Sequence, residues 1–297
     1  MSFDRVNEPL AADASGEPEN WSAWIGRTET VIEKICAWRT AALAATFDWD
    51  DAPAEGAQLP PGWHWLFFNP IARRRDLGLD GHPKRGGFLP PVALPRRMWA
   101  GGRITYHAPL LIGEEAHRVS EILKIESKEG KSGRLVFVTL RHTTSVRGDR
   151  RIEEEQDLVY RPHAAPGTAS PSKPTEPRRA QWSEQIYPDT TLLFRYSALT
   201  FNGHRIHYDQ AYALEDEGYP DLVVHGPLTA TLLQGFAVRL WPTRRLARFS
   251  FRGVAPLFAN RSFRIEASTV EGNSDELALW AHGEGGIAMQ ATAVFAR

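Results

Sequence analysis

The sequence predicts an α+β fold in which a helix followed by an antiparallel sheet occurs twice. Three observations lead to this prediction: each half offers helix-forming sequence, each half ends in strand-like segments, and a proline-rich segment separates the halves. The predicted domains are residues 1–161 and 181–297, joined by a linker at residues 162–180. Each of the two sheets is expected to wrap around a central helix.

The first half begins with a short helix and continues into strands. Residues 37–47 are rich in alanine, which favours a helix, and their apolar side chains lie on one side of it. Apolar and polar residues then alternate along three segments, as expected of strands with one buried face. These segments are residues 119–126, 134–142 and 156–160, with a turn at residues 129–133.

The linker has no hydrophobic period and is dense in proline and small polar residues, so it is expected to stay extended and solvated. Beyond it, residues 227–241 form a longer and largely apolar segment that begins with proline. Proline suits the first position of a helix, and a helix that is apolar nearly all round should be buried. Three further alternating segments are expected as strands: residues 263–270, 276–282 and 289–295.

The composition excludes several classes of function. Of the 297 residues, 42% are hydrophobic and 24% charged, as in a soluble globular protein. The net charge of -1 gives no field that favours nucleic acid or an anionic membrane. The single cysteine, Cys36, rules out an intrachain disulfide, and no apolar run is long enough to span a bilayer. The polar and acidic N-terminus is unlike a signal peptide, so we expect a cytoplasmic protein.

Two short segments carry the chemistry. Residues 199–209 (LTFNGHRIHYD) crowd two histidines, an arginine, an asparagine and an aspartate together. Residues 223–228 (VVHGPL) end in a glycine-proline step that should open the buried helix. A proton carrier beside the N–H groups of a helix N-terminus suits chemistry on a carbonyl or thioester.

These segments resemble the MaoC-like (R)-specific enoyl-coenzyme A hydratases and dehydratases, which have the hot-dog fold. Within that family, the resemblance is to a subgroup of mitochondrial-type 3-hydroxyacyl-thioester dehydratases and mesaconyl-coenzyme A hydratases. Residues 77–83 (LGLDGHP) and 86–102 (GGFLPPVALPRRMWAGG) resemble the degenerate first hot dog of that subgroup. The resemblance covers roughly residues 20–297 and implies a double hot dog, with the first half shaping the acyl pocket.

The resemblance also assigns roles to single residues. His207 stands in the place of the family's catalytic histidine, and Gly226 in that of the glycine whose N–H polarises the thioester carbonyl. Asn202 replaces the catalytic aspartate, and His204 stands where the family has asparagine. An amide cannot accept a proton as a carboxylate does, so Asn202 can orient water but cannot act as a base.

A substitute for the missing carboxylate is therefore needed. Asp209 is the nearest candidate, although it could instead face the next turn of chain. Arg205 could bind a free carboxylate of the substrate through its fork of N–H groups, or pair with Asp209 or Glu215 as part of the structure.

Other residues have both a functional and a structural interpretation. His225 either contacts the substrate or makes a capping or core hydrogen bond. Arg96 and Arg97 either bind the phosphates of coenzyme A or form a solvated corner. The three histidines at 204, 207 and 225 lack the spacing of a known metal site, so we expect no metal, and no cofactor.

The leading functional hypothesis is reversible hydration of an acyl-coenzyme A thioester, with 3-methylfumaryl-CoA giving citramalyl-CoA. A dehydratase of linear 3-hydroxyacyl thioesters, on coenzyme A or acyl carrier protein, is the second. A non-catalytic acyl-CoA-binding protein, favoured by Asn202, is the rival from another class, and a thioesterase comes last. The family resemblance further implies a homodimer.

Overall fold

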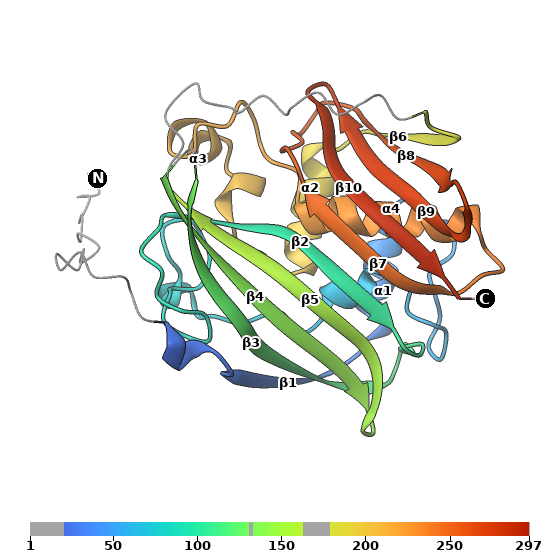
Figure 1. Cartoon of the computed structure of the whole chain (residues 1–297), viewed down its shortest axis with the longest axis horizontal. Coiled ribbons are helices and arrows are strands. Elements are labelled where there is room, and N and C mark those ends of the chain that lie inside the picture. The colour runs from blue at the N-terminus through green and yellow to red at the C-terminus, as the bar shows by residue number, and fades with distance from the viewer. Residues whose placement is uncertain (1–20, 131–132, 163–178, 297) are drawn as a thin grey trace.

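A computed structural model of the chain describes residues 21–130, 133–162 and 179–296, and Figure 1 shows its elements in order. Within these residues the strands are β1 Thr28–Lys34, β2 Arg96–Tyr106, β3 Glu115–Gly130, β4 Gly133–Val146, β5 Asp149–Arg161, β6 Trp182–Ile186, β7 Leu246–Gly253, β8 Phe263–Val270, β9 Asn273–Gly283 and β10 Gly286–Phe295. The helices are α1 Ala37–Thr46, α2 Thr190–Leu199, α3 Gln210–Glu215 and α4 Gly226–Leu240. Short 3₁₀ turns are η1 Ser22–Trp24, η2 Trp63–Leu66, η3 Arg74–Asp76 and η4 Arg205–His207.

The strands join in one antiparallel sheet with the order β1-β3-β4-β5-β2-β7-β10-β9-β8-β6. The first five strands in this order come from the first half, and the second five repeat the same topology in mirror order. The internal repeat expected from the sequence is therefore present. Where two separate sheets were predicted, the two halves are joined edge to edge through β2 and β7 (Figure 1).

Two glycines allow this join. Gly101 pairs with Arg252 and Gly102 with Phe251, next to a β-bulge between Trp99 and Gly101. A Cβ on Gly101 would lie 2.5 Å from the carbonyl oxygen of Phe251, too close for any side chain. The glycine pair thus lets the two strands approach each other beside a bulge.

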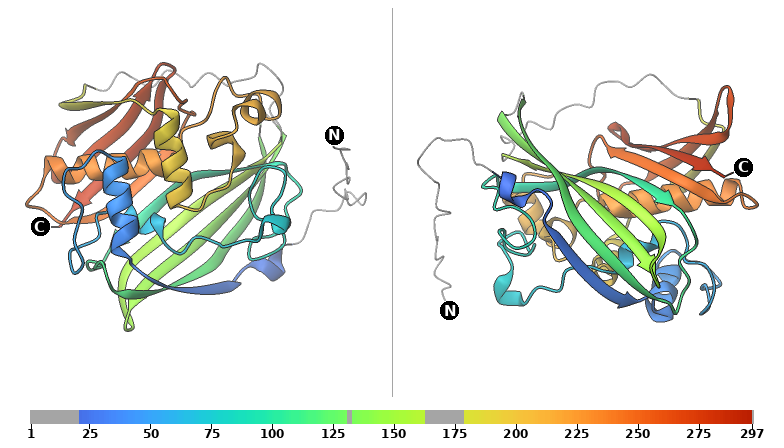
Figure 2. Two further views of the ribbon diagram at one scale, coloured as in Figure 1. Left: turned by 180° about the vertical axis from the view of Figure 1, so that it is seen from behind. Right: turned by 60° about the horizontal axis from the view of Figure 1, so that its bottom comes forward.

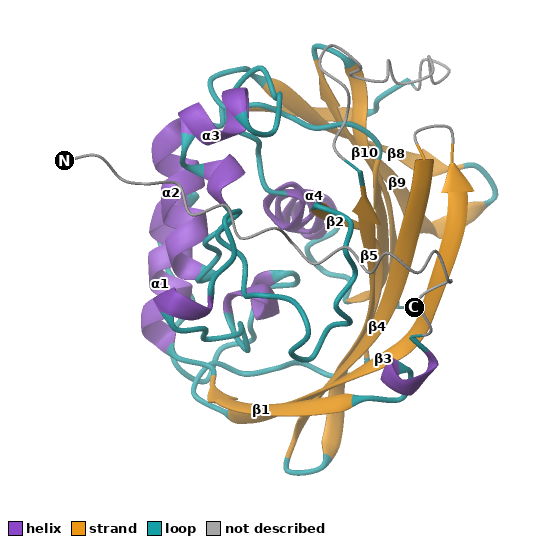
Figure 3. Cartoon of the chain, turned by 90° about the vertical axis from the view of Figure 1, so that its left-hand side faces the viewer, coloured by secondary structure: helices purple, strands orange, loops and turns teal. Residues whose placement is uncertain are grey.

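Helix α4 is the central helix of the second half, as predicted. It packs against β7, β8, β9 and β10, and Figure 3 shows it end-on between the sheet and the helices α1, α2 and α3. Leu228 and Leu233 are fully buried and Phe236 is nearly so. Burying each such side chain stabilises the fold by about 1.5–3 kcal/mol.

The first half differs from the prediction. Helix α1 forms where expected, but it packs beside α2, as Figure 2 shows from behind, and the strands of its half do not wrap around it. The inner face of those strands is instead covered by η2 and the loops on either side of it (Figure 3). Trp63, Leu66 and Phe67 are buried there, so large side chains fill the place of a central helix.

The predicted linker lies almost wholly outside the described residues, so the domain boundaries stay a prediction. None of the helices in the described part of the chain is long and apolar enough to cross a membrane.

Candidate active site

A cavity of about 1800 Å³ lies where the two halves meet. Its walls come from the loop before β2, the inner face of β2, β4 and β5, the end of α2, the segment around η4 and the first turn of α4. Of the catalytic and binding candidates named from the sequence, those that line it are Arg96, Arg97, Asn202, His204, His207 and Gly226. Arg205, Asp209 and His225 are not among its lining residues.

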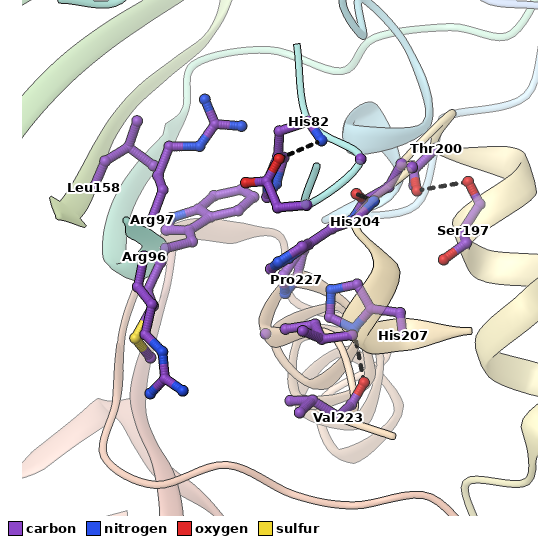
Figure 4. Close-up of a pocket in the computed structure, with 18 of the residues that line it drawn as sticks. His82, Arg96, Arg97, Leu158, Ser197, Thr200, His204, His207, Val223 and Pro227 are labelled. Atoms are coloured by element: carbon purple, nitrogen blue, oxygen red, sulfur yellow. Dashed lines mark hydrogen bonds and ion pairs between the residues drawn. The ribbon is translucent and has the colours of Figure 1, made fainter. Parts of the chain in front are cut away.

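His207 presents one ring nitrogen to this cavity. It lies on η4, where Nδ1 donates to the carbonyl oxygen of Val223 at 2.7 Å (Figure 4). Burial lowers the pKa of His207 to about 4, although this hydrogen bond opposes the shift. The imidazole is therefore neutral at pH 7, and with its proton on Nδ1 its Nε2 is a free acceptor.

The N-terminus of α4 opens into the same cavity. Gly226 is the first residue of the helix and Pro227 follows it, as the glycine-proline step predicted. The first N–H groups of a helix have no partner within the helix, and they attract negative charge. Gly226 N–H can thus donate to an oxyanion on a thioester whose β-carbon faces His207.

His225 supports His207 from behind. Its side chain is fully buried, its Nε2 lies 2.8 Å from the Ser197 hydroxyl, and its ring stacks on that of His207 with 3.7 Å between centroids. The core hydrogen bond is therefore the interpretation that the geometry favours, over contact with the substrate.

Arg205 and Asp209 pair with each other. The Nε and Nη2 atoms of Arg205 lie 3.0 and 2.8 Å from one carboxylate oxygen of Asp209, whose other oxygen accepts from the N–H of Tyr212 at the start of α3. The hypothesis of Asp209 as the substitute for the missing carboxylate and that of Arg205 as the clamp for a substrate carboxylate both lose support, because each side chain is engaged outside the cavity.

Arg96 and Arg97 begin β2, and Figure 4 shows their side chains extending in different directions. Arg96 is buried and forms an ion pair with Glu217, its Nε 2.6 Å from Oε2. Neither residue is the solvated corner that the sequence suggested. Arg97 is half-buried in the cavity wall and forms no ion pair with another described residue.

Comparison with known proteins shows to which family the chain belongs. The family model of hydroxyacyl-thioester dehydratase type 2 matches residues 62–259. The chain is 48% identical to the mesaconyl-C(4)-CoA hydratase of Chloroflexus aurantiacus over 92% of this chain and 97% of that protein. The chain belongs to the hydroxyacyl-thioester dehydratase type 2 family.

Further relatives agree in sequence and in fold. A mitochondrial hydroxyacyl-thioester dehydratase type 2 of Schizosaccharomyces pombe is 32% identical over 71% of this chain and 78% of its own. A solved MaoC-like dehydratase superimposes with a TM-score of 0.66 at 17% identity, covering 92% of this chain and 98% of its own. A Mycobacterium tuberculosis protein described as having a double hotdog fold gives a TM-score of 0.56 at 13% identity, covering 92% and 96%. The double hot-dog fold is confirmed, and the protein is a hydro-lyase of acyl thioesters.

Asn202 departs from the aspartate that the resemblance led us to expect at this place in the family. Its side-chain oxygen accepts a hydrogen bond at 3.0 Å from the N–H of His204, two residues on. The amide thus closes a local turn, and it brings no negative charge to the cavity.

Sequence reasoning missed Asp80 and His82 as site residues. They lie in the LGLDGHP segment, which served only to show the resemblance, and both line the cavity. The ring of His82 lies 4.1 Å from that of His204, centroid to centroid, and Figure 4 shows the two rings together. The signal was present: an aspartate and a histidine two residues apart, on either side of a glycine.

Asp80, His82 and His204 each offer a ligand atom within 4.8 Å of the others, the spacing of groups that can share a cation or a water molecule. The Asp80 carboxylate lies 3.0 Å from His82 Nδ1, and this hydrogen bond accounts for the closeness of two of the three groups. The structure thus gives a reason for this cluster other than a metal ion.

Proposed function

We propose that this protein hydrates 3-methylfumaryl-CoA, the thioester that its Chloroflexus relative's name calls mesaconyl-C(4)-CoA, to citramalyl-CoA. The observation that carries the proposal is the neutral His207 facing the open N-terminus of α4 in one cavity. The relative, 48% identical over nearly its whole length, supports the choice of substrate.

The chemistry uses groups that the site provides. A water hydrogen-bonded to Nε2 of His207 attacks the β-carbon, and its oxygen forms the new C–O bond. The electrons of the double bond move toward the thioester oxygen, where Gly226 N–H and the dipole of α4 stabilise the enolate. The proton that the water loses ends on the α-carbon, so one water adds and nothing else is consumed.

The substrate carries a carboxylate on the β-carbon, close to the reacting atoms, and therefore needs a cation near the histidines. Arg97 is placed to supply it, because it lines the same cavity as His82, His204 and His207. Its positive charge also helps to lower the pKa values of His82 and His204. Its guanidinium is not engaged by another described carboxylate in an ion pair. We therefore move the proposed carboxylate-binding role from Arg205 to Arg97.

The test is the loss of enoyl-thioester absorbance with purified protein and two substrates, 3-methylfumaryl-CoA and a linear enoyl-CoA. We expect turnover of the carboxylated ester, citramalyl-CoA as its product by mass spectrometry, and no turnover with His207→Ala. Arg97→Gln should raise KM for the carboxylated ester at least tenfold and leave the linear ester unchanged. Arg195→Gln, an exposed arginine on α2, is the matched control.

The second candidate is a dehydratase of linear 3-hydroxyacyl thioesters. The Schizosaccharomyces pombe relative favours it, and so do the apolar side chains Leu135, Phe137 and Leu158 in the cavity wall. Turnover of linear esters alone would establish this function and refute the first. Binding without turnover of any ester would contradict both and leave the non-catalytic interpretation. The homodimer and the cytoplasmic location stay predictions, which native mass spectrometry and cell fractionation can check.

A further inference from the structure

The active site lacks a carboxylate where the sequence led us to look for one. Asn202 is an amide and turns back onto the N–H of His204. Asp209 caps α3 and pairs with Arg205. A neutral imidazole that accepts a proton from water becomes a cation, and a nearby carboxylate stabilises that cation. The carboxylate must therefore come from elsewhere.

Asp80 provides one from the first half of the chain. One of its carboxylate oxygens lies 3.0 Å from Nδ1 of His82, and the other accepts the N–H of the same residue at 3.0 Å. Burial raises the pKa of Asp80, but the hydrogen bonds and charge of His82 outweigh this and the net shift is downward, so Asp80 is ionised. The bond to Asp80 places the proton of His82 on Nδ1 and leaves Nε2 as an acceptor, the arrangement of an aspartate–histidine pair in acid–base catalysis.

The loop that carries this pair is held against the catalytic segment of the second half. Gly81 packs directly on the carbonyl group of Gly203, where a Cβ would overlap it, and the φ of Gly81 is +85°. The N–H of Arg205 donates to the carbonyl oxygen of Asp80 at 2.9 Å, and its Nη1 donates to that of Leu79 at 3.1 Å. Arg205 is thus a positioning residue, which joins the two halves at the site.

The rings of His82, His204 and His207 follow one another along the cavity wall. The ring of His82 lies 4.1 Å from that of His204, tilted by 38°, and the ring of His204 meets that of His207 edge-on at 5.4 Å. A nitrogen of His82 lies within 4.8 Å of one of His204, a span that one water molecule can bridge. His82 and His207 therefore both line the cavity next to His204, and each has an acceptor nitrogen to offer to a water molecule.

We propose that His82, oriented by Asp80, is the second catalytic histidine and the group that carries the proton during hydration. This rests on the proposed function. His207 and His82 each accept one hydrogen of the attacking water. As the oxygen bonds to the β-carbon, the proton passes to Nε2 of His82, because Asp80 is negative whereas the partner of His207 is a neutral carbonyl. The imidazolium then gives the same proton to the α-carbon, and His82 returns to neutral.

The test uses Asp80→Asn and His82→Gln in the full-length protein, with 3-methylfumaryl-CoA and a linear enoyl-CoA. We expect kcat to fall about 100-fold or more in each, the range for loss of a general acid–base group, while KM changes less than threefold. Asp76→Asn and His107→Gln, exposed residues outside the cavity, should keep the activity of the wild type. The thermal midpoint of each variant verifies that it folds.

Two readouts separate catalysis from a structural role. Adding Asp80→Asn to His82→Gln should cost little more activity, since the pair acts as a unit. The groups that face His82 are Asp80, Arg97, His204 and Arg85. When Asp80→Asn removes the negative group, the pKa of His82 should fall. The acid limb of the pH profile of kcat/KM, which reflects protonation of His82, should then move to lower pH.

Several results would overturn the proposal. Activity of Asp80→Asn and His82→Gln within threefold of the active wild type would remove the pair from the mechanism. Loss of wild-type activity on treatment with EDTA, restored by Zn²⁺, would make the cluster a metal site instead of a proton carrier. A wild type that turns over no ester would contradict the proposed function itself, which is a different outcome from either.

Discussion

The imidazole of His82, from the first half of the chain, contacts that of His204, from the second, with 4.1 Å between ring centroids. The first half was expected to shape the acyl pocket only. This contact, together with the hydrogen bonds from Arg205 to the loop of Asp80, means that both halves supply polar groups at the place of reaction. The site is therefore complete only when the two halves are docked.

The histidine cluster should make the fold sensitive to acid. Burial lowers the pKa values of His82 and His207 to about 4, and those of His204 and His225 also fall, whereas an unfolded histidine titrates near 6.5. Between these values the unfolded chain binds more protons than the folded one. The stability is thus fully present above pH 6.5 and is lost as the pH falls toward 4, by up to about 1.4 kcal/mol per pH unit for each histidine.

Urea unfolding at pH 7, 6 and 5 measures this dependence. We expect a falling free energy of unfolding over the series, and a shallower fall in His204→Gln. His107→Gln, an exposed histidine, should follow the wild type. Equal free energies at pH 7 and pH 5 would show that these imidazoles are not held neutral by burial.

Local signals in the sequence predicted several of the elements but not all of them, and not all of their partners. The glycine-proline step and apolar run fixed α4, and alternation predicted most of β3, β4, β8, β9 and β10. The elements that were missed are β1, β2, β6, β7, α2 and α3. In β2 and β7, glycines and arginines hide the alternation, and the pairing of these strands joins distant parts of the chain. Helix α1 was placed correctly along the chain, but composition does not say what a helix packs against, so its central position was wrong.

In the site, too, residues in local motifs could be predicted from the sequence, and residues that depend on long-range contacts could not. His207 and Gly226 could be found because each lies in a short motif, whereas the role of Asp80 depends on a loop docking on residues far along the chain. From the sequence, either Asp209 or Glu215 could pair with Arg205, and only the structure shows that the partner is Asp209. Pairings between distant residues depend on the whole fold, so they cannot be predicted from a short segment of the sequence.

Arg205→Lys should lower kcat for carboxylated and linear esters alike. A lysine keeps the charge, but it cannot contact both Asp209 and the carbonyl oxygen of Leu79, so the loop of Asp80 and His82 loses a tether. We expect a fall of about tenfold in kcat, as small misplacements of catalytic groups are costly. If only KM for the carboxylated ester rose, Arg205 would be the substrate clamp after all, and the steady-state kinetics of both esters decide between the two.

The buried pair of Arg96 and Glu217 should matter for stability. Only 7% of each side chain is exposed, and Tyr212 also donates to the Glu217 carboxylate at 3.2 Å. Arg96→Ala leaves that carboxylate buried without its cation, which costs about 3–5 kcal/mol. Chemical denaturation measures the change. The half-exposed Arg103, on the same strand as Arg96, pairs with Asp157 of β5 and is the matched control; Arg103→Ala should cost about 0–1 kcal/mol.

The double variant Arg96→Met with Glu217→Met tests the reason for that loss. With both charges gone, the penalty of an unpaired buried charge disappears, so the double variant should be more stable than Arg96→Ala. A normal free energy of unfolding in Arg96→Ala, with a raised KM for every CoA ester, would instead return Arg96 to phosphate binding.

Gly226→Ala should separate folding from catalysis. A Cβ at this position meets nothing within 4 Å, so the helix can accept it, and alanine is the better helix former by about 1 kcal/mol. The added methyl group nevertheless stands at the mouth of the α4 N-terminus, where the thioester oxygen must approach the N–H. We expect kcat/KM to fall at least tenfold at an unchanged or higher thermal midpoint. Gly235→Ala, on the same helix but outside the cavity, should keep full activity. Full activity in Gly226→Ala would mean that the thioester oxygen binds elsewhere, and that the helix N-terminus does not stabilise the enolate.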